Sequence, residues 1–437
     1  MRGLFGLAAA TVAAFVTSSL AIPLTVQPGN SNDIVITKEN TLNSTAGVHS
    51  PVAPQAASPL KLEIVNNFSS NQMYLYITGQ DSKGSACFVD ATGKFYYPNA
   101  GGSAVPVPIK GNIATSLGKK GSTTKVTVPD SLISARIWVA EGKLQFNTVV
   151  DGNGNSAIVE PSPTNPKDPS ANIKWGFVEF NWQDGNMYAN ISYVDWVGIS
   201  MGMGLTLASG KTQVVKGLKA GAVDDICKDI ITQNSKDKAG WNDLCVKSGS
   251  SSNAEVIRVL SPNLYIADNA TWQSSYYTDY INKVWSQYTN ADLTIDTQGS
   301  AGKVTCRVTG GKLTCKGDNR AYPKPTLADI YGCNSGPFAI VASDNAVHKA
   351  VVPRLCAAFN RSTFLLKGGN VQPGVSSKEY YTANPTNHYS RIVHKYEQDG
   401  LGYAFSYDDV NPGGENAAGT VSGSKPTLLK VTAGSWS

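Results

Sequence analysis

The sequence predicts a mainly β protein in which a β-sandwich or β-barrel lobe is interrupted by a mixed α/β lobe. Short β-forming runs bounded by Gly, Pro, Asn or Asp follow one another from Leu60 to about residue 205. Apolar residues then recur at helical spacing in segments between residues 206 and 368, and β-forming runs return after residue 369. Such an insertion produces two lobes, and we expect a wide groove between them, where ligand sites are commonly found.

The first part of the β lobe is predicted over residues 60–205. In the run LKLEIVNNF, Leu60, Leu62 and Ile64 alternate with polar residues, which is the pattern of a half-buried strand. Further β-forming runs are MYLYITGQD, CFVDATGKFYYP, AVPVPI, TKVTVP, ARIWVAEGKLQF and GFVEFNW. Many short strands at this spacing indicate a sandwich or a barrel.

The mixed α/β lobe is predicted over residues 206–368. Helices are expected where apolar residues repeat every three or four positions, in residues 222–232, 270–288 and 345–359. The last helix is expected to have Ser343 or Asp344 as its N-cap. Short strands are expected between the helices, near residues 292–297, 303–308 and 312–316. Residues 369–437 then return to the β lobe through the runs GYAFSYDDV and TLLKVTAG.

Residues 1–21 have the pattern of a secretory signal peptide. A positively charged start is followed by the apolar run Leu4–Val16, and Ser19 and Ala21 supply the small residues of a cleavage site. We therefore expect a secreted protein, extracellular or associated with a cell wall, with no membrane contact after the signal peptide is removed. Residues 22–59 are rich in Pro, Ser, Asn and Thr, and they are predicted to be a flexible linker or a pro-segment.

The seven cysteines fit an oxidising compartment outside the cell. Spacing alone leaves their connectivity open. Six fall into plausible local pairs, namely Cys227 with Cys245, Cys306 with Cys315, and Cys333 with Cys356. Cys87 stands apart and is expected to be a buried free thiol. Asn-x-Ser/Thr sequons make the protein a candidate for N-glycosylation, at Asn43, Asn67, Asn190, Asn269 and Asn360.

Charge and motif content argue against several classes of function. The formal net charge is +5 over 437 residues, and no run of Lys or Arg indicates a nucleic-acid partner. The four His are not spaced as metal ligands and no Cys-x-x-Cys occurs, so the sequence predicts no metal site. No heptad repeat indicates assembly, and a monomer is expected.

The segment Gly176–Ile199, GFVEFNWQDGNMYANISYVDWVGI, carries a set of polar residues typical of sugar-binding surfaces. It is β-forming on both sides of Asp184-Gly185, a hairpin signal that would place Gln183 opposite Asn186. In that register one face is apolar, and the other carries Glu179, Asn181, Tyr188, Asn190 and Ser192. Amides and carboxylates pair with sugar hydroxyls, and aromatic rings cover apolar sugar faces. A plain solvated sheet is the alternative, but it would more often carry Lys, Glu and Thr.

This segment resembles family 64 of the glycoside hydrolases, the laminarioligosaccharide-releasing β-1,3-glucanases of bacteria and fungi. The resemblance rests on FVEFNW followed by the aspartate of SYVDWVGI, and it extends over most of Leu60 to Gly434. It includes the motifs YITGQD, DYINKVW and YAFSYDDVNP. The last motif also resembles thaumatin-like proteins, to which the family is structurally related.

The resemblance implies an inverting hydrolase with a thaumatin-like β-sandwich or barrel lobe, an inserted α/β lobe and no metal or organic cofactor. Glu179 matches the family's general acid and Asp195 its general base. Glucan contacts are implied, and the polar face adds one more; together they are Asn181, Gln183, Tyr188, Asn190 and Ser192. The implied function is a secreted endo-β-1,3-glucanase acting on β-1,3-glucan polysaccharide such as laminarin, curdlan or cell-wall glucan.

An acid/base role sets two requirements. Glu179 must hold a proton, and Phe177 and Phe180 are candidates for the apolar surroundings that this needs. An inverting pair is also about 6.5–9.5 Å apart, which leaves room for the attacking water. In a regular hairpin Asp195 would lie on the opposite face about five residues farther along, or roughly 16 Å away. We therefore expect a bulge, a longer loop or a bend near Tyr193-Val194 that brings Asp195 round.

Two other classes of function remain open from the sequence. A non-catalytic thaumatin-like β-glucan-binding protein of the cell wall would need the groove but not both Glu179 and Asp195. A structural or interaction protein of the cell surface would explain export and glycosylation, but it would not explain the paired acids. The two carboxylates together therefore favour the enzyme.

Overall fold

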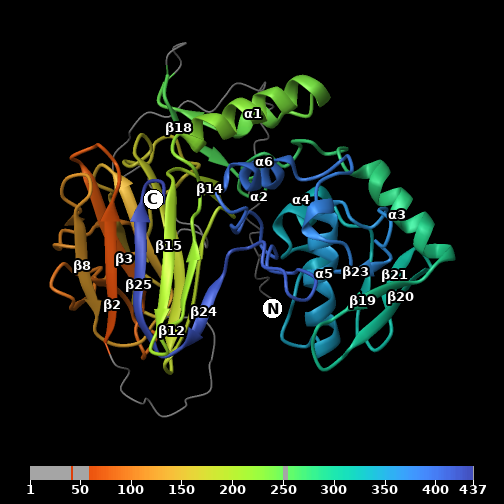
Figure 1. The fold of residues 1–437 in the computed structure, drawn as a ribbon, viewed down its shortest axis with the longest axis horizontal. Coiled ribbons are helices and arrows are strands. Elements are labelled where there is room, and N and C mark those ends of the chain that lie inside the picture. The colour runs from red at the N-terminus through yellow and green to blue at the C-terminus, as the bar shows by residue number, and fades with distance from the viewer. Residues whose placement is uncertain (1–40, 43–58, 250–253, 437) are drawn as a thin grey trace, which may run out of the picture.

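The computed structural model describes residues 41–42, 59–249 and 254–436, which form two lobes. In Figure 1 the strands of the β lobe stand side by side on the left, and the α/β lobe lies on the right. The last strand of the chain returns to the β lobe, so the mainly β fold with an inserted α/β lobe agrees with the sequence-based prediction. The predicted signal peptide lies outside the described residues.

The β lobe is a sandwich of two sheets. The larger sheet consists of β3 (Met73–Gln80), β4 (Ala86–Val89), β5 (Phe95–Tyr96), β7 (Thr115–Ser116), β9 (Leu132–Glu141), β12 (Lys174–Gln183), β13 (Asn186–Ile191) and β24 (Val421–Ser424). Its strand order is β24-β13-β12-β9-β3-β4-β5, and β7 also pairs with β3. The facing sheet consists of β2 (Leu60–Asn66), β8 (Thr123–Val128), β15 (Met201–Leu207), β16 (Thr212–Val215) and β25 (Pro426–Ala433). Its order is β16-β15-β25-β2-β8.

An apolar core fills the space between these two sheets. Ile137 and Val178 contribute to it from the larger sheet, and Ile64, Met203 and Val431 contribute from the facing sheet. All five side chains are fully buried. Burial alternates along β2 and β13 because successive side chains of a strand point to opposite faces. The other face of the larger sheet is therefore free to carry polar residues.

Two smaller sheets lie over that other face. One has the order β1-β11-β10-β6 and consists of β1 (Thr41–Leu42), β6 (Val107–Pro108), β10 (Asn147–Val150) and β11 (Ser156–Val159). The second has the order β14-β18-β17 and consists of β14 (Trp196–Val197), β17 (Cys245–Lys247) and β18 (Val256–Leu260). A second apolar cluster packs beneath them, around Trp138, Trp175, Phe177 and Trp196. Within the predicted linker, β1 is ordered by pairing with β11.

The α/β lobe combines another sheet with helices. The sheet has the order β22-β21-β20-β19-β23 and consists of β19 (Leu293–Asp296), β20 (Lys303–Thr309), β21 (Lys312–Cys315), β22 (Ala321–Tyr322) and β23 (Val371–Gln372). The helices are α1 (Ala222–Asp237), α2 (Pro262–Asp268), α3 (Thr278–Asn290), α4 (Leu327–Gly332), α5 (Ala346–Arg361) and α6 (His388–Tyr396). Short 3-10 turns occur at Trp241–Leu244, Gly336–Phe338 and Ser377–Glu379. Figure 1 shows α3 and α5 beside this sheet, whereas α1, α2 and α6 lie near the junction of the lobes.

The chain crosses between the lobes later than the sequence predicts. Strand β16 still pairs with β15 of the sandwich, so the chain leaves the sandwich after residue 215 rather than at residue 206. Strand β23 pairs with β19 of the α/β sheet, and the chain rejoins the larger sheet of the β lobe only with β24. These boundaries depend on which strand each short segment pairs with, and the periodicity of apolar residues does not predict strand pairing.

Some local predictions also need correction. The N-cap of α5 is Asn345, whose side chain accepts a hydrogen bond from His348 N, and not Ser343 or Asp344. Helix α6 occupies a stretch of the tail that the sequence left without a helix. Residues 402–410, expected as β, form mostly turns.

The predicted disulfides are confirmed, and they are Cys227–Cys245, Cys306–Cys315 and Cys333–Cys356. Cys87 is buried and free, as expected. The Asn360 side chain is fully buried and donates to the carbonyl of Ile330 at 2.6 Å, so this sequon is not open to glycosylation in the folded protein. No helix in the described part of the chain is both long and apolar enough to cross a membrane.

Candidate active site

The candidate site is built on the hairpin of β12 and β13. Its register pairs Glu179 with Asn190 across the strands, as the sequence predicts. The turn residues Asp184 and Gly185 have φ values of 53° and 69°, the positive values that a type I′ turn needs. Because the register is fixed by this turn, Val178 points into the sandwich core, and Glu179 points to the opposite face.

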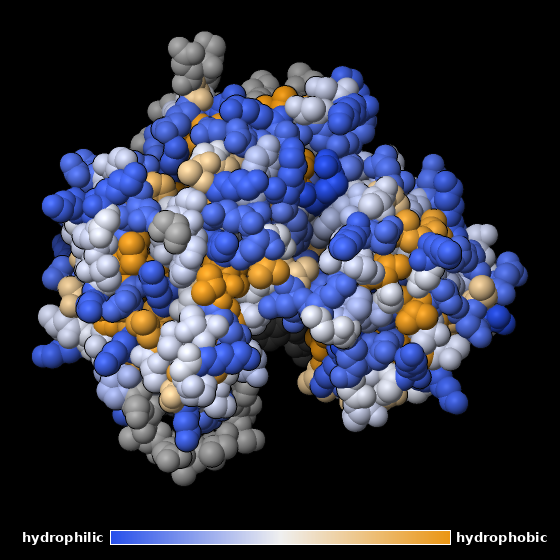
Figure 2. Space-filling view, in the orientation of Figure 1, coloured by the Kyte–Doolittle hydropathy of each residue, from blue (hydrophilic) through white to orange (hydrophobic). Residues whose placement is uncertain are grey.

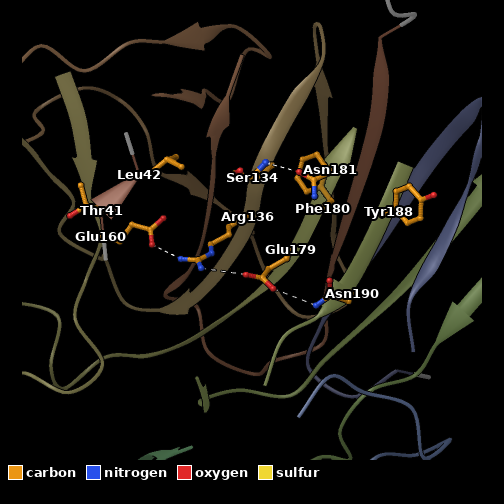
Figure 3. A pocket seen from close by; sticks show the side chains of 11 residues that line it. Thr41, Leu42, Ser134, Arg136, Glu160, Glu179, Phe180, Asn181, Tyr188 and Asn190 are labelled. Carbon is orange, nitrogen blue, oxygen red and sulfur yellow. Dashed lines mark hydrogen bonds and ion pairs between the residues drawn. The ribbon is translucent and has the colours of Figure 1, made fainter. Parts of the chain in front are cut away.

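A polar pocket of about 370 Å³ lies on that face. It is lined by Thr41, Leu42, Ser134, Ala135, Arg136, Glu160, Glu179, Phe180, Asn181, Tyr188 and Asn190. Four predicted site residues are therefore brought together, namely Glu179, Asn181, Tyr188 and Asn190. Figure 3 shows them along β12 and β13, with Arg136 and Glu160 on the side toward β1. These residues all belong to the β lobe. Figure 2 shows an indentation of the surface between the two lobes.

Arg136 of β9 lies at the centre of the acidic part of this pocket. It is the cross-strand neighbour of Glu179. Its guanidinium donates to Glu160 Oε2 at 2.5 Å and to Glu179 Oε1 at 3.3 Å (Figure 3). On the other side, Asn190 Nδ2 donates to Glu179 Oε2 at 3.5 Å. The Glu179 side chain is 35% exposed and the Glu160 side chain 4%, so a ligand can reach Glu179 directly.

Charge interactions link three carboxylates through this guanidinium. Burial alone would lower the pKa of Arg136, but Glu160, Glu179 and Asp195 together raise it. Burial raises the pKa of Glu160, and Arg136 opposes that rise. Asp195 acts on both Arg136 and Glu160, so its carboxylate belongs to the same electrostatic group as Glu179.

A bend carries the chain from β13 to Asp195. The backbone N–H of Tyr193 donates to the carbonyl of Tyr403 at 2.8 Å, and the Tyr389 hydroxyl donates to the Tyr193 carbonyl at 2.6 Å. The Asp195 carbonyl accepts from Ser261 N at 2.8 Å, and β14 then pairs with β18 outside the larger sheet. The chain therefore bends near Tyr193-Val194, and contacts from distant parts of the chain hold this bend.

Two predicted contact residues, and the phenylalanine rings expected around Glu179, lie elsewhere than predicted. Gln183 is exposed beside the turn and Ser192 is buried in a bridge to Tyr403, and neither side chain lines the pocket. The Phe180 ring belongs to the sandwich core on the far face, because alternate residues of β12 point in opposite directions. Phe177 stacks against the Arg136 guanidinium at 4.4 Å instead of enclosing Glu179 in an apolar pocket.

Arg136, Glu160 and Ser134 were not predicted from the sequence. Ser134 N donates to Asn181 Oδ1 at 2.7 Å, which ties the amide of Asn181 to β9 where the pairing of β9 and β12 is irregular. The sequence does contain a signal for the two charged residues: Arg136 lies inside the apolar run ARIWV, and Glu160 directly follows the apolar run of β11. A charged residue in such a run needs a buried partner.

A reachable carboxylate, a second carboxylate in the same electrostatic group, and a rim of amide and aromatic side chains are the features of a glycoside hydrolase. In the described ranges, no group of three or more His, Cys, Asp or Glu side chains is arranged to hold a metal ion. The chain belongs to glycoside hydrolase family 64, because the sequence profile of that family, described as beta-1,3-glucanase, matches residues 58–433.

Two curated relatives are similar over most of this chain. They are glucan endo-1,3-beta-glucosidases of Arthrobacter sp. (strain YCWD3) and of Cellulosimicrobium cellulans, each 28% identical over 367 residues. The alignments cover 82% of this chain and 63% of each relative. The chain therefore spans less than two thirds of the length of these relatives.

Solved structures resemble the whole fold. A laminaripentaose-producing β-1,3-glucanase in complex with laminaritetraose matches with a TM-score of 0.73 and 28% identity, over 86% of this chain and 99% of that one. A β-1,3-glucanase domain from Clostridium beijerinckii matches with a TM-score of 0.68 and 21% identity, over 88% of this chain and 100% of that one. The second likeness supports the fold alone.

Proposed function

We propose that the protein is a secreted, monomeric endo-β-1,3-glucanase that hydrolyses its substrate with inversion of configuration. The observation that carries the proposal is the open polar pocket around Glu179, with Asp195 in the same electrostatic group. Family membership and the two curated relatives support the reaction. The similar glucanase in complex with laminaritetraose supports β-1,3-glucan as the class of substrate.

In this mechanism the two carboxyl groups act on opposite sides of one sugar. Glu179 gives a proton to the departing glycosidic oxygen, and Asp195 removes a proton from the water that attacks the anomeric carbon. The bond between that carbon and the glycosidic oxygen breaks as the bond to water forms. Asn181, Tyr188 and Asn190 contribute amide and aromatic surface along the same face, where they bind the glucan chain.

Secretion is supported by the N-terminal pattern and by the three disulfides, which persist in an oxidising environment. The exported protein is expected to begin at Ile22. N-terminal sequencing of the protein recovered from the medium tests this, and an N-terminus at Met1 would contradict it.

The reaction is tested by incubating the protein with laminarin and with insoluble curdlan and measuring the release and size of reducing sugars. Glu179→Gln and Asp195→Asn are each expected to lose activity by about 10²- to 10⁴-fold, because a positioned acid or base contributes that much to the rate. Asp184→Asn is the matched control, since this carboxylate is exposed at the turn and lies outside the pocket. It should retain the activity of the unmodified chain.

Three outcomes have different consequences. Release of oligosaccharides by the unmodified chain with loss in both variants supports the proposal. No release at any mildly acidic to neutral pH, from a protein that still binds curdlan, would replace the enzyme by a glucan-binding protein. Full activity in Glu179→Gln would leave the glucanase reaction standing but remove the proposed mechanism.

A further inference from the structure

The contact between Arg136 and Glu179 conflicts with the role of Glu179 as an acid. A positive charge within about 4–6 Å favours the ionised form of a carboxyl group. Here the guanidinium is 3.3 Å from Glu179 Oε1, whereas the proposed reaction needs a proton on that group. Without a second partner, Arg136 would hold the Glu179 side chain in place but would also favour loss of the proton that the reaction needs.

Glu160 changes this balance. It contacts the same guanidinium at 2.5 Å, closer than Glu179 does, and its side chain is 4% exposed against 35% for Glu179. Opposite charges interact more strongly at short range and away from water. Arg136 therefore interacts more strongly with Glu160 than with Glu179. The guanidinium also packs against aromatic rings, at 4.4 Å from the centre of the Phe177 ring and 5.5 Å from the centre of the Trp138 ring.

We propose that Glu160 and Arg136 are a pair of positioning residues, in which Glu160 neutralises Arg136 so that its guanidinium orients Glu179 without keeping it ionised. This inference rests on the proposed function and assigns a task to two residues of the same site. Arg136 supplies a donor that fixes one oxygen of Glu179, and Asn190 supplies a donor to the other oxygen. Glu160 takes no direct part in the reaction.

Other titratable groups also lie around Arg136 and Glu179. Asp195, after the bend, acts on Arg136 and Glu160 as a further negative charge. Tyr403 of the tail faces this region, and its pKa is raised by burial and by carboxylates that include Asp409 and Glu179. Arg136 is thus surrounded by acidic groups, and Glu160 is the one in closest contact with it.

The test is the pH dependence of kcat/KM for laminarin in the full chain and in Glu160→Gln. Gln keeps an oxygen that can accept from Arg136 but removes the charge, so Glu179 should lose its proton at lower pH. The basic limb of the profile is expected to move down by about one pH unit or more. In Arg136→Gln/Glu160→Gln, where both charges are absent, the limb should return toward its original position while kcat stays low, because Glu179 is no longer oriented.

Two further variants separate charge from structure. Glu160→Asp keeps the charge, and it should leave the basic limb in place even if kcat falls. Glu63→Gln removes one partner of the surface ion pair with Lys125, and it should change neither the limb nor kcat. An unshifted limb in a folded Glu160→Gln protein would overturn the proposal, as would equal shifts in Glu160→Gln and Glu160→Asp.

A second readout does not depend on activity. NMR titration of ¹³C-labelled glutamate carboxyls, with the Glu179 signal identified by its loss in Glu179→Gln, gives the titration midpoint of Glu179 directly. The midpoint should fall in Glu160→Gln relative to the unmodified chain, and an equal midpoint would overturn the proposal. If the unmodified chain fails to hydrolyse laminarin, the proposed function fails, and this titration still decides the role of Glu160. If Glu160→Gln does not fold, Glu160→Ala replaces it, because it removes the same charge while Arg136 stays charged; the Glu179 midpoint should fall there too, and an equal midpoint would overturn the proposal.

Discussion

At the scale of single residues, Tyr188 stands out because 61% of its surface is exposed although it lines the pocket. Binding is favoured when the apolar face of a sugar covers an aromatic ring that is otherwise exposed to water. We expect Tyr188→Ala to raise KM for laminarin about tenfold, which corresponds to about 1.4 kcal/mol, with little change in kcat. Steady-state kinetics on laminarin measure both constants.

The control for this variant is another exposed apolar side chain of the same lobe. Val214 of β16 is 41% exposed and lies outside the pocket. Val214→Ala should leave KM unchanged, and thermal melting should show both variants folded as stably as the unmodified chain. A tenfold fall in kcat at constant KM in Tyr188→Ala would show that the ring acts on the reaction rather than on binding.

At the same scale, the sequence identifies the residues of the hairpin but not their partners. Alternation and the Asp184-Gly185 turn predict the register of β12 and β13, and therefore which face Glu179 occupies. Arg136 and Glu160 come from β9 and from the end of β11, and only the strand order brings them beside Glu179. Pairing between distant strands depends on the whole sheet, so the local sequence pattern does not predict it.

At the scale of elements, a buried ionic network joins α6 to the tail that follows it. His394 lies 2.8 Å from Glu397 and 2.9 Å from Asp408, and Arg361 lies 2.7 Å from Asp408. Burial alone would lower the pKa of His394, but the two carboxylates raise it from 6.5 to about 10. His394 is therefore charged in the folded protein at neutral pH.

This network predicts the direction in which stability changes with pH. Because the pKa of His394 is higher in the folded than in the unfolded chain, its contribution is complete below about pH 6.5 and disappears as pH rises to about 10. We expect the melting temperature of the unmodified chain to exceed that of His394→Gln by roughly 5 °C at pH 6, and by much less at pH 10. Thermal melting monitored by circular dichroism over this range measures the difference.

His388, on the same helix, provides the control. Burial and the neighbouring Arg391 lower its pKa to about 4, so it stays neutral between pH 6 and pH 10. The effect of His388→Gln on the melting temperature should therefore be the same at both pH values. A His394→Gln difference that does not narrow toward pH 10 would show that the histidine is not charged in the fold.

The same network explains why the tail was hard to predict. Helix α6 has nine residues, and its burial depends on partners such as Asp408 that lie farther along the chain. The run GYAFSYDDV has β-forming residues, but the Asp408 carboxylate accepts a hydrogen bond from Ala404 N at 2.9 Å, which closes a turn. The long β12–β13 hairpin is specified locally, whereas this segment takes its shape from tertiary ion pairs.

At the scale of the whole molecule, the two lobes make different contributions to the candidate active site. The β lobe supplies the pocket residues, and parts of the chain outside its two main sheets hold the bend before Asp195 through Tyr389, Tyr403 and Ser261. The insertion between β16 and β24 therefore does more than separate two halves of a sandwich. It sets the position of one of the two carboxylates on which the proposed mechanism depends.

The stereochemistry of the first product tests the central claim most directly. Proton NMR during the first minutes of laminarin hydrolysis distinguishes the anomers of the newly formed reducing end before they interconvert. Because water attacks from the side opposite the departing oxygen, an inverting enzyme acting on a β-linkage releases the α-anomer first. Early appearance of the α-anomer is the result that we predict. Early appearance of the β-anomer would show retention and would contradict the roles assigned to Glu179 and Asp195.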